Sequence, residues 1–283
     1  RVKDMMLYRC HNCGLSTTFG KLLERIDAES YKRYIMARYS NGETKHTMHD
    51  TVEYTSVKMK QTTLLDTVKT ASRLSPEHPV RDYLNKRMIP EEQWDELRLV
   101  NKFCTFVNRV VPGTFQNIKE DHPRLIIPFY DRTGKFFAFQ GRAFGKEQPK
   151  YVTIKLDESK EKIYGLDRLD LNKPVNIVEG PIDSLFLDNC IAMAGADVSL
   201  KIPTDQCTMI FDNEPRNEQI VNRMIDAVHK NYKVVIFPQS LKYKDINDMV
   251  IHKKDVGDVS KLIYNNTQKG LSALQSINNW KRI

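Results

Sequence analysis

Three short apolar stretches in the second half of the chain each lead into acidic side chains. Apolar runs of this length, bounded by turn residues, are typical of buried strands. The acids recur at equal spacing, and the carboxyl ends of parallel strands meet at one edge of an open α/β sheet, where such folds hold their ligands. We therefore expect the acids to converge. The runs and their acids are Val175–Val178 with Glu179, Cys207–Phe211 with Asp212 and Glu214, and Lys233–Phe237 with Asp245 and Asp248.

The same region alternates between strand-like and helix-like segments. Ile191–Gly195 has the composition of a further strand, and Glu218–Lys230 carries apolar residues at helical spacing. This alternation predicts an α/β fold, with a parallel sheet and helices on both of its faces. Residues 256–283 are expected to form a helical tail.

The clustered acids suggest a magnesium site. A single acid at a strand end is often only a turn former, so the set carries the prediction. Carboxylate oxygens suit Mg²⁺, and Asp212 and Glu214 would point to the same side of an extended chain. Two or more such ions can activate a hydroxyl and neutralise phosphate charge. Glu179 could be a ligand or a general base, and Asp183, one helical turn on, would orient the cluster.

The composition indicates a globular chain from a reducing compartment. Its 283 residues suggest about two domains. No apolar run approaches the roughly 20 residues of a membrane span, and no secretory signal is present. Five cysteines without a framework pattern favour a reducing environment. Because the chain begins with Arg1 rather than Met, we expect N-terminal residues to be missing.

The charge is unevenly distributed. Almost all of the net charge of +8 lies in residues 1–172. A basic region beside a cluster of acids suggests a bound polyanion, although a well-solvated basic surface would explain the charge equally well. The sequence has no Gly-x-x-x-x-Gly-Lys-Ser/Thr loop, which argues against an ATP-driven motor. No Ser/His/Asp or Cys/His arrangement stands out.

Cys10-His-Asn-Cys13-Gly14 is half of a zinc knuckle. A structural zinc site needs four ligands, and no second Cys-x-x-Cys follows. The partner pair could precede Arg1, or His11 and a distant group could substitute. The alternative is two ordinary free cysteines.

A hairpin is expected near the middle of the chain. Two apolar runs, Arg124–Tyr130 and Lys135–Gln140, flank a turn that contains a glycine. Arg142 and Lys150 follow, so these two cations and Arg124 could line one groove. The alternative for each of them is an ordinary surface cation.

These motifs resemble a known family. Glu-Gly-x-x-Asp from Glu179, Asp-x-Glu from Asp212 and Lys244-Asp-x-Asn-Asp look like the Toprim domain of primases, topoisomerases and some nucleases. The segments around them resemble the basic subdomain that precedes Toprim in bacterial-type DNA primases, and Leu7–Tyr39 resembles the primase subunits of T-even-like bacteriophages. The basic-subdomain segments are Val80–Arg87, Arg124–Gly134, Phe139–Arg142, Pro149–Tyr151 and Lys162–Leu166.

The resemblance implies synthesis of short RNA primers on a single-stranded DNA template during phage replication. It implies Mg²⁺, a zinc ribbon, ribonucleoside triphosphates and a replicative helicase as partner, in the cytoplasm of a bacterial host. The fold would be a partial zinc ribbon (1–20), a helix and linker (21–62), a mixed α+β basic subdomain (63–172), a Toprim domain (173–255) and a helical tail (256–283). The implied site residues are Glu179 and Asp183 as catalytic groups, Glu179, Asp212, Glu214, Asp245 and Asp248 for metal, Cys10 and Cys13 for zinc, and Arg124, Arg142, Lys150 and Lys244 for nucleic acid or nucleotide.

The chain departs from the family pattern in one respect that bears on the metals. Asp-x-Glu replaces Asp-x-Asp, so the second metal could be held differently. Two rival functions remain at this point. One is a Toprim nuclease or topoisomerase-like enzyme, and the other is a non-catalytic single-strand binder that uses the aromatic residues Phe136, Phe137 and Phe139.

Overall fold

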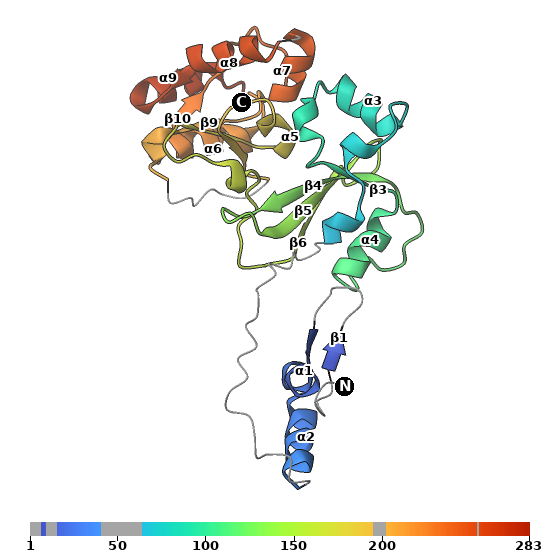
Figure 1. The fold of residues 1–283 in the computed structure, drawn as a ribbon. Coiled ribbons are helices and arrows are strands. Elements are labelled where there is room, and N and C mark those ends of the chain that lie inside the picture. Colours follow the sequence, from blue (N-terminus) through green and yellow to red (C-terminus); the bar gives the residue numbers. More distant parts are fainter. Residues whose placement is uncertain (1–6, 10–15, 41–63, 195–201, 254) are drawn as a thin grey trace. The chain divides into compact units, whose positions relative to one another are not determined.

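The computed structural model describes residues 7–9, 16–40, 64–194, 202–253 and 255–283. The chain forms two compact units, Arg1–Thr62 and Thr63–Ile283 (Figure 1). Both predicted zinc ligands, Cys10 and Cys13, lie outside the described residues. The same holds for nearly all of the expected linker.

The first unit consists of a hairpin and two helices. Strands β1 (Leu7–Arg9) and β2 (Ser16–Thr18) pair in antiparallel register. Helices α1 (Phe19–Ile26) and α2 (Ala28–Ser40) follow. Where exposure is described in residues 18–40, the side chains are intermediate or exposed, so this part has little core of its own.

An antiparallel sheet opens the second unit. Its strand order is β3-β4-β5-β6, and β4 and β5 form the predicted hairpin. Helix α3 begins at Pro79 because His78 caps it: its Nδ1 accepts a hydrogen bond from the Val80 amide. The elements are η1 (Leu64–Thr67), η2 (Ala71–Arg73), α3 (Pro79–Lys86), η3 (Glu91–Gln93), β3 (Arg98–Val100), α4 (Phe103–Val110), β4 (Arg124–Tyr130), β5 (Phe136–Ala143) and β6 (Tyr151–Lys155).

Successive residues of β4 face opposite sides of this sheet, as strand geometry requires. Leu125 and Ile127 are buried in a core cluster that continues into the rest of the unit. Ile126 belongs to a separate cluster with Phe103 and Phe106 of α4. Helix α4 therefore covers one face of the sheet, and the remainder of the unit covers the other.

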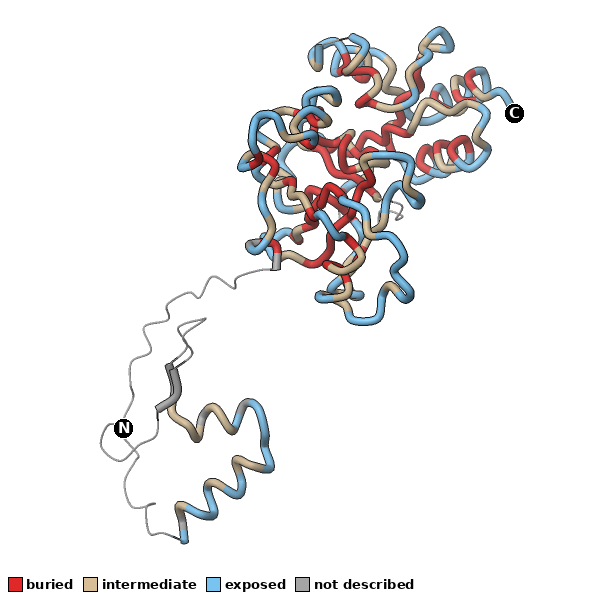
Figure 2. Tube along the Cα trace, turned by 90° about the vertical axis from the view of Figure 1, so that its right-hand side faces the viewer, coloured by how far each residue is buried: buried red, intermediate tan, exposed pale blue. Residues whose placement is uncertain are grey.

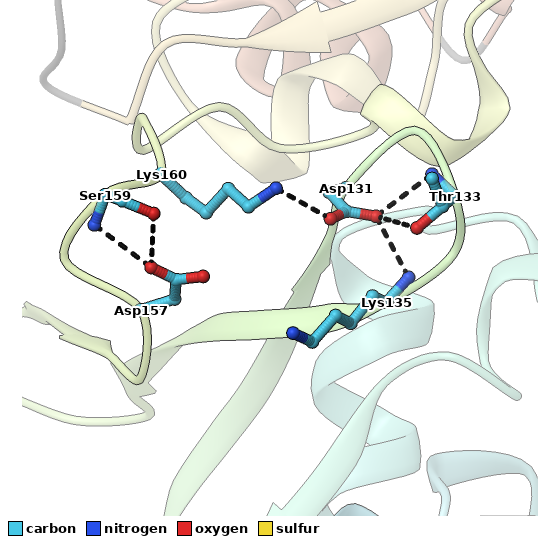
Figure 3. A network of polar contacts seen from close by, with 6 residues as sticks. All are labelled: Asp131, Thr133, Lys135, Asp157, Ser159 and Lys160. Carbon is cyan, nitrogen blue, oxygen red and sulfur yellow. Dashed lines mark hydrogen bonds and ion pairs between the residues drawn. The ribbon is translucent and has the colours of Figure 1, made fainter.

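The turn between β4 and β5 is held by one buried carboxylate (Figure 3). Asp131 accepts hydrogen bonds from the Thr133 amide, the Thr133 hydroxyl and the Lys135 amide. Its other oxygen pairs with Lys160 at 3.0 Å. The Thr133 hydroxyl and Lys160 hold the pKa of Asp131 well below its ordinary value. Both oxygens of Asp131 are therefore used to stabilise the turn.

The second sheet confirms the predicted α/β class. Its order is β11-β10-β9-β7-β8, and β10, β9, β7 and β8 run parallel while β11 is antiparallel. The tail that was expected to be helical thus also contributes an edge strand. The elements are η4 (Leu166–Arg168), β7 (Val175–Val178), α5 (Pro181–Ser184), β8 (Cys190–Ala192), η5 (Thr204–Gln206), β9 (Cys207–Ile210), α6 (Glu218–His229), β10 (Lys233–Val235), α7 (Ile246–Lys253), α8 (Val256–Asn265), β11 (Thr267–Gln268) and α9 (Gly270–Trp280).

Helices cover both faces of this sheet, as predicted. Ile182 of α5 and Met249 of α7 pack in the cluster that also holds Leu125 of the antiparallel sheet. Val221 of α6 and Ile277 of α9 pack in a cluster on the other face. The two sheets therefore share one continuous core, seen as the buried segments in Figure 2. None of the helices in the described residues combines the length and apolarity that a bilayer span requires.

Candidate functional site

Acidic side chains from three neighbouring strand ends face one another at the carboxyl edge of the parallel sheet. Glu179 directly follows β7, Asp212 comes just after β9, and Asp245 directly precedes α7 in the segment after β10. Because β7 pairs with β9 and β9 with β10, these ends are adjacent. We call this group the acid edge; its members are Glu179, Asp183, Asp212, Glu214 and Asp245.

Glu179 is paired with an arginine from the next helix. Arg223 of α6 donates from Nη1 to Glu179 Oε1 at 2.6 Å. The same guanidinium lies over the Phe211 ring, 5.3 Å from its centroid. Burial raises the pKa of Glu179 although Arg223 opposes the shift. The sequence analysis missed Arg223, whose only signal is a cation within an otherwise amphipathic helix.

Asp212 and Glu214 share a single cation. Lys244 Nζ lies 2.6 Å from Glu214 Oε1 and 3.6 Å from Asp212 Oδ2. Hydrogen bonding to Lys244 lowers the pKa of Glu214. Burial and the charge of Glu179 raise the pKa of Asp212 to about 7, even though Lys244 acts in the opposite direction. The two carboxylates therefore converge on one positive centre. The backbone between them turns tightly and is not extended as their spacing predicts, with the Glu214 amide bonded to the Asp212 carbonyl at 2.8 Å.

Asn213, between Asp212 and Glu214, is held by hydrogen bonds to neighbouring backbone carbonyls. Asn213 donates from its amide to the Lys244 carbonyl, and from its side chain to the Leu241 and Tyr243 carbonyls. Its side-chain oxygen accepts a hydrogen bond from Trp280 Nε1. The orientation of the acid pair thus depends on the loop before α7 and on the last helix, which sequence reasoning did not anticipate.

Asp183 lies one turn beyond Glu179. Its Oδ1 accepts a hydrogen bond from the Asn247 amide at 2.9 Å. Its Oδ2 occupies the space beside Gly180, where an added Cβ would come within 2.7 Å. Burial and the nearby charge of Asp245 raise the pKa of Asp183. Asp183 therefore links α5 to the first turn of α7.

Asp245 and Asp248 differ in their placement. Asp245 caps α7, since its Oδ1 accepts from the Asp248 amide at 2.7 Å, and its charge acts on Asp183 and Asp212. Asp248 lies in the first turn of α7. Within the described residues, its carboxylate forms no hydrogen bond or ion pair with the acid edge. Of the five predicted metal ligands, the structure brings together four.

The acid edge has the donor chemistry of a divalent-cation site. Lys244 occupies the place where Asp212 and Glu214 converge, so one cation already stands there. Burial and, after it, repulsion from the neighbouring acids raise the pKa of Asp212, and a second cation would relieve that repulsion. In the present arrangement, no group of three or more acidic, histidine or cysteine side chains in the described ranges is close enough to hold a metal ion. The residues fit Mg²⁺ in kind.

Two cations from the antiparallel sheet lie near the acid edge. Arg142 is only 3% exposed and lies over the rings of Tyr83 and Tyr151. Its charge acts on Asp183. Lys150 is near enough for Asp245 to raise its pKa, against a net lowering that comes mainly from burial. Among the described residues, Arg142 Nε and the Tyr83 hydroxyl have no hydrogen-bond partner.

Asn247 connects Arg87, the residue after α3, to the acid edge. Asn247 is 1% exposed; its side chain donates to the Arg87 carbonyl and accepts from Arg87 Nη1, both at 2.7 Å. Its own amide bonds Asp183. The signal for this link was present in the segments Val80–Arg87 and Lys244–Asp248, but sequence alone does not pair them.

The structure does not bring Arg124 into this group. It lies on the α4 face of β4, with its guanidinium over the Phe103 ring, 5.1 Å from the centroid. It donates to the carbonyls of Gly141, Pro149 and Lys150. These contacts occupy Arg124 in holding β4, β5 and the approach to β6 together, so it does not share a groove with Arg142.

Comparison with known proteins identifies the relatives of this chain. No family model matches it. It is 31% identical over 280 residues to the DNA primase of Enterobacteria phage T4, covering 97% of this chain and 81% of the relative. It is 22% identical to the DNA primase of Thermotoga maritima, covering 92% of this chain and 53% of that protein, so it spans about half of the bacterial relative.

Solved structures with the same fold are primase domains. The Aquifex aeolicus primase, comprising zinc-binding and RNA polymerase domains, aligns with a TM-score of 0.55 and 17% identity over 97% of this chain and 78% of its own. A DnaG primase catalytic domain bound to single-stranded DNA aligns with a TM-score of 0.51 and 15% identity over 74% of this chain and 81% of its own. The fold is that of a primase-type RNA polymerase.

With the phage relative, the assignment becomes specific: the chain belongs to the bacterial-type DNA primases, nucleotidyltransferases that synthesise RNA primers on single-stranded DNA. The rival nuclease and non-catalytic binder are not favoured by any of these relatives.

Proposed function

We propose that the acid edge is where this primase joins ribonucleotides, and that it does so with two or more bound Mg²⁺ ions. The observation that carries the proposal is the convergence of five carboxylates whose burial and repulsion raise the pKa of Glu179, Asp183 and Asp212. Asp212 and Glu214 would hold the metal, with Glu179, Asp245 and Asp248 completing the sites. When bound, Mg²⁺ supplies charge neutralisation at the phosphates and lowers the pKa of an attacking hydroxyl.

The chain's own residues have distinct parts in this proposal. Glu179 is the catalytic carboxylate, and Arg223 keeps it oriented through their 2.6 Å contact. Asp183 positions the cluster through Asn247. Lys244 keeps Asp212 and Glu214 together until the metal enters.

Arg142 and Lys150 would bind the negatively charged substrates. The charge of Arg142, which acts on Asp183 at the acid edge, would attract a phosphate of the ribonucleoside triphosphate or of the template. Lys150 adds a second positive charge beside it. Arg124 supports this surface from behind, through the Lys150 and Pro149 carbonyls.

The remaining parts of the proposal concern the rest of the replication machinery. Cys10 and Cys13 would supply half of a zinc site between β1 and β2; the Aquifex neighbour that aligns over this region includes a zinc-binding domain. A replicative helicase is the proposed partner, and the host cytoplasm the proposed location. The five segments expected from the sequence remain the proposed division of the chain.

A primer-synthesis assay tests the proposal. Glu179→Gln keeps the size of the side chain but removes its charge, and should abolish ribonucleotide oligomers made on single-stranded template with Mg²⁺. Glu92→Gln, an exposed glutamate of η3, is the matched control and should retain synthesis. Full activity in Glu179→Gln would refute the proposal. Cleavage of the DNA without nucleotides would point to the rival nuclease.

A further inference from the structure

A second hollow with basic walls lies beside α4, outside the acid edge. Its volume is about 730 Å³, and residues 67–78 and 99–109 form it. No carboxylate lines it. We call it the basic pocket. Its four cationic side chains, all exposed, are Lys69, Arg73, Lys102 and Arg109.

These four cations differ from those at the acid edge in having no counter-ion. Arg223 and Lys244 are each paired with a carboxylate at 2.6 Å. Across the part of the chain that the structure describes, the four side chains of the basic pocket form no ion pair and no hydrogen bond. Like charges around one hollow repel one another, so a polyanion would be attracted to it.

Asp121, an acid close to α4, is already engaged by the backbone. Asp121 accepts hydrogen bonds from the amides of Cys104 and Thr105 and from the Thr105 hydroxyl. Both of its oxygens are thereby used to cap the first turn of α4. Asp121 therefore caps α4 from a later segment of the chain, and the charge of the pocket remains available.

The floor of the pocket is apolar. Val68, Leu74, Leu99 and Phe106 line it beneath the charged side chains. An apolar floor with a cationic rim matches single-stranded nucleic acid, whose bases and phosphates would meet the two parts. The volume lies in the range of about 300–1,000 Å³ that small ligands occupy, which suits a few nucleotides and not the broad face of a duplex.

The basic pocket is separate from the acid edge, since no acid-edge residue lines it. It lies beside β3, an edge strand of the antiparallel sheet. Val100 and Phe106 of the pocket pack in the cluster of Ile126, whereas Leu74 packs in the cluster of Leu125. We infer that the basic pocket binds the sugar–phosphate backbone of a single-stranded nucleic acid, apart from the acid edge. This contact extends the proposed function but does not need its metal site.

The salt dependence of binding tests this inference. A fluorescently labelled dT oligomer is titrated with the full chain at several NaCl concentrations without divalent ions, and anisotropy gives the affinity. Each phosphate contact contributes about 0.7 to the slope of log K against log[salt] for single strands. Lys102→Ala/Arg109→Ala should therefore reduce the slope by about 1.4, and Lys69→Ala/Arg73→Ala by a similar amount.

The matched control removes two charges elsewhere. Lys253 and Lys261, exposed on α7 and α8, are replaced by Ala and should leave the slope unchanged. If the pocket variants lose no more slope than this control, the inference is wrong. It is also wrong if labelled poly-glutamate binds as tightly as the oligomer and loses the same slope, since the pocket would then recognise charge alone. Asp212→Asn should keep the wild-type slope, so the outcome is independent of the acid edge.

Discussion

Asp131 and Asp212 are both acids at the end of a buried strand, yet the protein treats them in opposite ways. Asp131 receives three hydrogen bonds and an ion pair from Lys160, and its pKa falls. Asp212 faces other acids, and its pKa rises to about 7. The first carboxylate stabilises a turn. The second is held in an environment that disfavours its charge, which is the expected condition of a group kept for a ligand.

The two arginines of the antiparallel sheet repeat the contrast. Arg124 gives its donors to three carbonyls, whereas Arg142 is buried with its Nε unpartnered among the described residues. The sequence places both in similar positions on paired strands. The two side chains lie on opposite faces of the sheet, since Arg142 pairs with Leu125 and Arg124 with Ala143, and only that of Arg142 lies on the face of the acid edge, where its charge acts on Asp183.

The largest expected effect follows from removing a charge at the acid edge. Asp212→Asn should reduce primer synthesis by about 100-fold or more, because metal stabilisation of charge contributes several kcal/mol. Its melting temperature should stay the same or rise, since the change removes a repelling buried charge. Steady-state synthesis and thermal unfolding measure both. Lost activity together with a lower melting temperature would contradict the comparison.

Whereas Asp212→Asn should mainly lower activity, Arg124→Ala should mainly lower stability. It leaves three carbonyls without their donor, which should lower the free energy of unfolding by about 3 kcal/mol. Arg142→Ala should change that free energy by only about 1 kcal/mol but weaken template or nucleotide binding. Urea unfolding and binding assays on both variants test the distinction. Equal destabilisation by Arg124→Ala and Arg142→Ala would contradict the distinction between these two arginines.

Asp131→Asn should lower the free energy of unfolding by about 2 kcal/mol, because charge-assisted hydrogen bonds to Thr133, Lys135 and Lys160 are weakened. The rate of primer synthesis per folded molecule should not change. Chemical denaturation, with activity normalised to folded protein, measures this. A specific loss of activity would place Asp131 among the functional groups.

Asp131→Asn should also show a smaller effect, in which its loss of stability relative to wild type depends on pH. The folded-state pKa of Asp131 lies below the ordinary value of 3.8, so its stabilisation is fully present above that value and is lost as the pH falls toward the folded pKa. The difference in melting temperature between wild type and Asp131→Asn should be constant above about pH 5 and shrink below pH 3.8. A difference that grows in acid would refute this sign.

The sequence predicted much of this molecule because its signals are local. Apolar runs ending in acids identified β7, β9 and the approach to α7, and the glycine-containing turn identified the β4–β5 hairpin. What it could not supply are pairings across long stretches of chain. Arg223 with Glu179, Arg87 with Asn247, and Trp280 with Asn213 are set by packing. The exclusion of Arg124 from the groove depends on which face of β4 it occupies.

The most direct test of the account is calorimetric titration of Mg²⁺ into the wild-type chain, Asp212→Asn and Asp131→Asn. The account predicts that wild type and Asp131→Asn bind Mg²⁺ alike and that their melting temperatures rise with it. Asp212→Asn should lose both the binding and the shift. Undiminished Mg²⁺ binding in Asp212→Asn would contradict the claim that the acid edge is the metal site.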